Sequence, residues 1–67
     1  MERTYKRAIT LEEKKEIVDR LLALWTRDKE MSDLRLGQMI WNVTQGGDFF
    51  YIEDYDFIKL IEEYYKD

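Results

Sequence analysis

Carboxylates are the main candidates for chemistry in this chain, because it contains no cysteine and no histidine. Thiolate nucleophiles, imidazole bases and the usual zinc ligands are therefore missing. Four acids lie close together in sequence, at Asp48, Glu53, Asp54 and Asp56. Hard cations bind carboxylate oxygens, but the spacing of a calcium loop, with its central glycine and distal glutamate, is not present. We expect these acids to cap helices and aid solubility, and we predict no metal ligand and no cofactor.

Catalysis by paired carboxylates requires that one of them lie in an apolar pocket inside a cleft. A chain of 67 residues has little room for such a cleft. The pair Gly46 and Gly47 lacks the further glycines and the lysine of a phosphate-binding loop. We therefore expect no enzymatic activity and predict no catalytic residue.

Arg35 and Gln38 are polar residues among apolar neighbours, and they could contact an anionic or amide-bearing ligand. The structural alternative is a bidentate, charge-assisted pair between Arg35 and either Glu53 or Asp54. We favour the structural alternative.

Composition indicates one small folded domain spanning residues 1–67, since 45% of the residues are apolar and 15% are aromatic. Residues 1–9 form a basic arm with Arg3, Lys6 and Arg7, whereas the last twenty residues hold seven acids against two lysines. The net charge is −4.

No apolar run reaches the roughly 18 residues of a membrane helix, and the first residues lack the apolar core of a signal peptide, so we expect a cytoplasmic protein without membrane contact.

A first helix is predicted from Thr10, because Thr10 and Glu13 have the spacing of a capping box. Its apolar residues fall on an arc about 160° wide, which predicts a broad buried face. The arc consists of Leu11, Ile17, Val18, Leu21, Leu22, Leu24 and Trp25.

A second helix is predicted from Ser32 or Asp33 to about Thr44, where Gly46 and Gly47 stop it. It has two apolar sides, and such a helix is either sandwiched or carries an exposed patch. One side holds Leu36, Met39, Ile40 and Val43, and the other holds Leu34, Gly37 and Trp41. Gly37 inside a helix predicts close approach by another backbone or an aromatic ring.

The segment 48–52 is rich in aromatic residues and predicts an extended connector that covers the helices. A third helix is predicted from Tyr55 to about Tyr65, after the acids Glu53 and Asp54. The fold class is therefore all-α, a small three-helix domain with an aromatic extended connector before the last helix. The centres of the apolar arcs predict the core: Ile17, Leu21, Leu24, Leu36, Ile40, Val43, Phe57, Ile61 and Tyr64.

Residues 33–40 read Asp-Leu-Arg-Leu-Gly-Gln-Met-Ile and residues 50–54 read Phe-Tyr-Ile-Glu-Asp, and these two segments resemble a family of short uncharacterised bacterial and phage proteins. That family shares a pattern of the form Asp-Leu-Arg-Leu-Gly-Gln-Leu-Ile, then a short loop, then Phe-Tyr-Ile-Glu-Asp and an apolar helix. Here the matching segments are residues 33–40 and 50–54, followed by Leu60 to Tyr64, and the resemblance covers roughly 21–65. It implies a shared fold and a bacterial host but no activity. Trp41 and the basic arm lie outside the pattern.

The remaining function is a non-enzymatic protein-protein interaction module. Its predicted contact residues are Leu34, Gly37, Trp41, Tyr51 and Tyr55, because tryptophan and tyrosine are enriched at interface hot spots and an acidic rim favours a basic partner. The partner is another protein or a second copy of this chain. By analogy with small acidic phage proteins, we expect an inhibitor or regulator of a host protein. The alternative is a small helix-turn-helix-like DNA-binding regulator, which the acidic third helix disfavours, so nucleic acid is not an expected partner.

Overall fold

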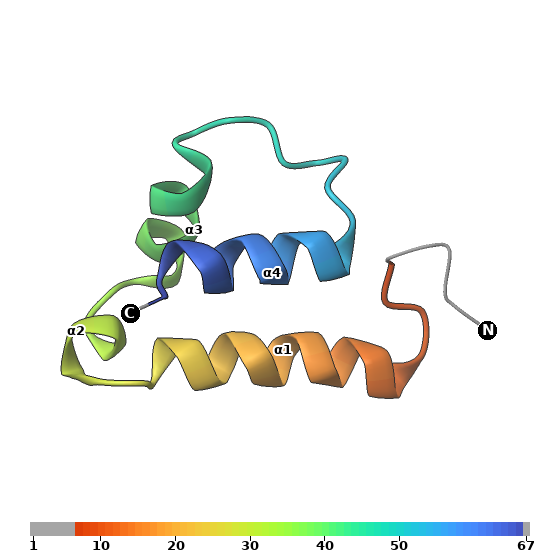
Figure 1. Cartoon of the computed structure of the whole chain (residues 1–67), viewed down its shortest axis with the longest axis horizontal. Helices are drawn as coiled ribbons and strands as arrows, with labels where there is room; N and C mark the ends of the chain where they lie inside the picture. The colour runs from red at the N-terminus through yellow and green to blue at the C-terminus, as the bar shows by residue number, and fades with distance from the viewer. Residues whose placement is uncertain (1–6, 67) are drawn as a thin grey trace.

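The computed structural model describes residues 7–66, and over this range the chain is helical with no strand. The helices are α1 (Leu11–Trp25), α2 (Lys29–Ser32), α3 (Leu36–Thr44) and α4 (Asp54–Tyr64). In Figure 1, α1 and α4 lie side by side and run in the same direction, while α3 crosses near the C-terminal end of α4. The all-α class is confirmed, and α2 is a short helix in addition to the three that were predicted. No helix among residues 7–66 combines the length and apolarity that a membrane crossing requires.

The predicted capping box at the start of α1 is confirmed. The hydroxyl of Thr10 accepts a hydrogen bond from the backbone N–H of Glu13 at 3.0 Å, and the Glu13 carboxylate accepts one from the N–H of Thr10, also at 3.0 Å. Each bond satisfies a backbone donor that has no partner within the helix. The start of α1 is therefore determined by residues local in sequence.

The second predicted helix begins later than expected. Asp28 caps a separate single turn, α2, by accepting from the N–H of Met31 at 2.9 Å, and α3 begins only at Leu36. The buried side chain of Met31 explains this arrangement, since the turn carries it into the core. At the start of α3 the side-chain oxygen of Gln38 accepts from the N–H of Arg35 at 2.9 Å, so Gln38 is used for local structure.

The core is built around α4, which packs against both α1 and α3. The buried members of its central cluster are Met31, Met39 and Ile61. Partly buried residues pack around these three, namely Leu21, Leu24, Trp25, Leu34, Val43, Phe57 and Tyr65. Ala8 and Ile58 are also buried.

Two predicted core residues were wrong, because Leu36 and Tyr64 are 40% and 52% exposed. Leu36 is the first residue of α3 and Tyr64 is the last of α4, so each lies at a helix end where fewer neighbours surround it. Met39 and Ile58, which the predicted core did not include, are buried in the interior.

The apolar arc of α1 is only partly covered. Its Ile17, Leu21 and Leu24 are half-buried, and α1 packs chiefly on α4. Leu11, Val18 and Leu22 are exposed, contrary to the predicted broad buried face. One neighbouring helix cannot cover an arc about 160° wide.

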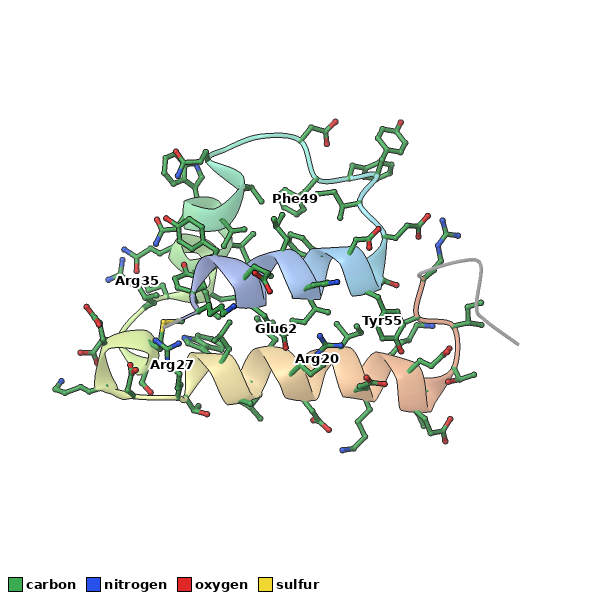
Figure 2. All side chains as sticks on the ribbon, viewed as in Figure 1. Arg20, Arg27, Arg35, Phe49, Tyr55 and Glu62 are labelled. Carbon is green, nitrogen blue, oxygen red and sulfur yellow. The ribbon has the colours of Figure 1, made fainter. Side chains whose placement is uncertain are left out.

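Polar contacts join the two long helices. Arg20 of α1 forms two hydrogen bonds with Glu62 of α4, from Nε at 2.9 Å and from Nη2 at 2.5 Å, and Figure 2 shows the two side chains facing each other. The hydrogen bond from Arg20 lowers the pKa of Glu62 below its usual value. The hydroxyl of Tyr65 donates to the backbone oxygen of Met39 at 2.8 Å, which ties the end of α4 to α3.

Candidate protein-binding surface

An apolar groove lies along one side of α3 and the chain that follows it. Its volume is about 500 Å³. We call it the Trp41 groove, because the indole of Trp41 is the largest side chain in it and is 56% exposed. The groove is lined by Gly37, Ile40, Trp41, Thr44, Gly46, Gly47 and Phe49.

The groove forms because the chain reverses direction at the end of α3. Gln45 and Gly46 both have left-handed backbone conformations, with φ values of 57° and 75°. The N–H of Gly47 donates to the backbone oxygen of Thr44 at 2.9 Å, which closes the turn. The reversal places Gly46 against the indole of Trp41. A side chain at position 46 would fill this part of the groove.

The far wall is Phe49, which points from the connector (residues 45–53) toward α4 in Figure 2. Its ring stacks on that of Phe57, with centroids 5.3 Å apart and an interplanar angle of 6°. This stacking anchors the connector to α4 and fixes the width of the groove.

The five predicted contact residues do not form one surface. Only Gly37 and Trp41 line the Trp41 groove. Leu34 precedes α3 and packs against the core, where its backbone oxygen accepts from Nε1 of Trp25 at 2.7 Å. Tyr51 lies farther along the connector, and the half-buried Tyr55 on α4 places its hydroxyl 3.4 Å from a carboxylate oxygen of Glu16 on α1.

A helix with two apolar sides was expected to be either sandwiched or to carry an exposed patch, and α3 carries an exposed patch. Trp41 is exposed on one side while Met39 is fully buried on the other. The expected close approach at Gly37 was wrong, since apart from its chain neighbours and the adjoining backbone of α3 no heavy atom lies within 4 Å of where its Cβ would be. Sequence reasoning also missed Gly46 and Phe49 as groove residues, because the two glycines were interpreted only as a helix stop.

The connector covers the helices only in part. Phe49 stacks on α4, but Phe50 and Tyr51 are 81% and 84% exposed. Their rings contact each other edge to face, with centroids 4.9 Å apart. The expectation that the whole aromatic segment covers the helices was therefore wrong for these two residues.

The predicted pairing of Arg35 with Glu53 or Asp54 was also wrong. Glu53 instead lies 3.4 Å from Nε of Arg7, and Asp54 accepts a hydrogen bond from the N–H of Ala8 at 2.8 Å. Arg7 and Ala8 of the predicted basic arm thus contact the start of α4. Arg3 and Lys6 lie outside the described residues.

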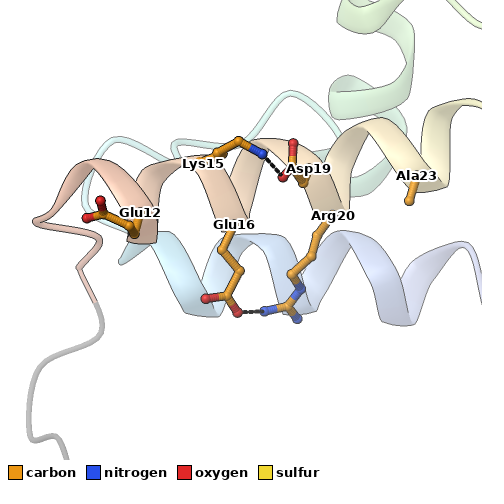
Figure 3. A pocket seen from close by; sticks show the side chains of 6 residues that line it. All are labelled: Glu12, Lys15, Glu16, Asp19, Arg20 and Ala23. Atoms are coloured by element: carbon orange, nitrogen blue, oxygen red, sulfur yellow. Dashed lines mark hydrogen bonds and ion pairs between the residues drawn. The ribbon is translucent and has the colours of Figure 1, made fainter.

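A second hollow lies on α1, where its six lining residues are shown in Figure 3. The charged groups there already have partners: Lys15 pairs with Asp19 at 2.8 Å, and Arg20 lies 3.7 Å from Glu16 in addition to its bonds to Glu62. These contacts indicate a solvated helix surface. Within residues 7–66 no group of three acids suitable for holding a metal ion is found.

No family model, curated protein or solved structure matches this chain. The resemblance to short bacterial and phage proteins therefore stays a prediction.

Proposed function

We propose that this protein is a small non-enzymatic interaction module, and that the Trp41 groove binds apolar side chains of a protein partner. The observation that carries the proposal is the exposed indole of Trp41 at the side of an apolar groove. Tryptophan is the residue type most enriched at interface hot spots, where it fills or lines a desolvated pocket. Solvent exposure of this ring has no structural benefit for an isolated domain.

Further aromatic residues lie in the connector that follows the Trp41 groove. Phe49, Phe50 and Tyr51 follow the groove along the connector and are all exposed. Exposed aromatic side chains gathered in one segment of a small protein are typical of an interaction site. They favour a protein partner over a small ligand, because a ligand seated in the Trp41 groove would leave Phe50 and Tyr51 uncovered.

Acidic side chains accompany these aromatic residues. Asp48, Glu53 and Asp54 lie in or beside the connector, and the whole chain carries a net charge of −4. Complementary charge speeds encounter and disfavours acidic competitors. We therefore propose a partner whose apolar contact residues are flanked by arginine or lysine.

Regulation of a host protein by a phage-encoded inhibitor is one specific form of this function, and it depends on the resemblance stated above.

The helix-turn-helix alternative has less support. Its recognition helix would be α4, which packs against both α1 and α3 and carries Asp56, Glu62 and Glu63. Such a helix would repel the phosphate backbone.

Affinity capture from bacterial lysate with three forms of the full chain tests the proposal. The forms are the wild type, Trp41→Ala, and the matched control Leu22→Ala, which shortens an exposed apolar residue on α1. A partner should be retained by the wild type and by Leu22→Ala and be lost from Trp41→Ala. Equal recovery with all three forms, recovery of nucleic acid, or self-association alone would contradict the proposal.

A further inference from the structure

A separate hollow lies where the connector meets the start of α4. Its volume is about 460 Å³, and it shares no lining residue with the Trp41 groove. We call it the connector hollow. It is lined by Arg7, Phe50, Tyr51, Ile52, Glu53 and Asp54.

The connector hollow combines two groups that hold organic cations. Aromatic ring faces attract cations, and carboxylates form charge-assisted hydrogen bonds with them. Phe50 and Tyr51 provide the rings, and Glu53 provides a carboxylate whose side chain is 41% exposed. Asp48 accepts a hydrogen bond from the N–H of Phe50 at 2.9 Å, so the backbone that presents the rings is held in place.

Arg7 shows that a guanidinium fits in the connector hollow, but its contact there is weak. Only its Nε is within reach of one Glu53 oxygen, at 3.4 Å, and the Arg7 side chain is 70% exposed. The pair of Arg20 and Glu62 shows what a well-bound arginine looks like in this protein, with two hydrogen bonds and a side chain that is 34% exposed. Glu53 therefore has capacity for a better-placed guanidinium.

The position of Arg7 is set by its neighbour. The buried Ala8 donates its N–H to Asp54 at 2.8 Å, and this bond holds the chain against the start of α4. The Arg7 side chain can therefore leave Glu53 while the backbone contact of Ala8 remains. Asp54 already has this structural role, which leaves Glu53 as the carboxylate open to a ligand.

We propose that the connector hollow binds an arginine side chain of the protein partner, and that Arg7 is an internal competitor for this site. The guanidinium pairs with Glu53 and lies against the rings of Phe50 and Tyr51, which contact each other. Arginine fits better than lysine, because its planar group both stacks on rings and pairs with a carboxylate through two donors. This proposal rests on the proposed function, since it supplies the charged part of the same partner's recognition.

The test is a titration of the ¹⁵N-labelled full chain with Nα-acetyl-arginine amide, followed by NMR. Shift changes are expected at residues 50–54. Arg7→Gln should lower the dissociation constant about two- to fivefold, the range of an exposed ion pair, because it removes the competitor. Glu53→Gln should raise the constant by a similar factor. Glu63→Gln, at an exposed carboxylate near the other end of α4, is the matched control and should have no effect.

The ring contact has its own variants. Tyr51→Phe retains the ring and should bind the probe as the wild type does, whereas Tyr51→Leu should bind it more weakly. Nα-acetyl-citrulline amide, which has a similar shape but no charge, should not bind. Equal binding of the two probes, or an unchanged constant in Arg7→Gln or Glu53→Gln, would overturn the proposal. Trp41→Ala should not affect probe binding, so failure here is distinguishable from failure of the Trp41 groove.

Discussion

Gly46 lies in contact with the indole of Trp41: a methyl group at position 46 would be 3.0 Å from Nε1 and 3.6 Å from Cε2 of the ring. Gly46 also has a φ of 75°, in the left-handed region that side chains disfavour. The chain reversal that forms the Trp41 groove therefore requires glycine at this position for two independent reasons.

Gly46→Ala should destabilise the fold by about 1–2 kcal/mol, from left-handed strain together with the contact with the indole. The NMR signal of the Trp41 indole N–H should also move. Gly37→Ala is the control, because Gly37 lies within α3 and its added Cβ would meet no atom within 4 Å beyond its chain neighbours and the helix's own backbone. Alanine there should stabilise the helix by about 0.5–1 kcal/mol. Urea unfolding measures both effects, and equal changes in the two variants would refute this description of the groove.

Ile61→Ala should cost about 2–5 kcal/mol of unfolding free energy, because Ile61 of α4 is buried in the core with Met31 and Met39. Leu36→Ala should cost less than about 1 kcal/mol, since Leu36 is exposed at the start of α3. The sequence alone predicted that both residues belong to the core and therefore that both substitutions are costly. The structure predicts unequal losses, and urea unfolding of the two variants distinguishes these predictions. Similar midpoints for the two variants would contradict the packing described.

The pair of Arg20 and Glu62 should make stability depend on pH. Because the hydrogen bond from Arg20 lowers the pKa of folded Glu62, its stabilisation is fully present above the unfolded pKa of about 4.3 and is lost as the pH falls through the lower folded value. Glu62→Gln should be less stable than the wild type by about 1 kcal/mol near neutral pH, since the pair is partly screened by solvent.

That difference between Glu62→Gln and the wild type should shrink below about pH 4, where the wild type also loses the charge of Glu62. Urea unfolding at several pH values measures it. Glu63→Gln serves as the control, because Glu63 is exposed near the same helix end. A stability difference that stays constant across this pH range would show that the ion pair does not contribute as described.

Helix starts were predictable where the cap is local. Thr10 and Glu13 form the capping box of α1 as expected, and α4 starts within one residue of the prediction. The start of the second predicted helix was not predictable in this way, because Ser32 and Asp33 can each cap a helix, whereas the cap that forms is Asp28 at the start of α2 and α3 begins only at Leu36. The choice of Asp28 depends on burial of Met31 against residues distant in sequence, which periodicity does not measure.

Groove residues were predictable only on the helix itself. Periodicity placed Trp41 on a separate side of α3, and the structure leaves that side exposed. The contributions of Gly46 and Phe49 depend on the direction the chain takes after α3, which follows from two consecutive left-handed residues and from stacking of Phe49 on Phe57. Leu34 was misplaced because it was assigned to a helix that begins only at Leu36.

We propose that Trp41 serves binding more than folding, and isothermal titration calorimetry of the captured partner tests this role most directly. Trp41→Ala should raise the dissociation constant at least about 30-fold, equivalent to about 2 kcal/mol, while urea unfolding shows a loss of less than about 1 kcal/mol in stability. Leu22→Ala should leave the dissociation constant unchanged. An unchanged dissociation constant for Trp41→Ala, or a loss of binding that only accompanies unfolding, would contradict the claim.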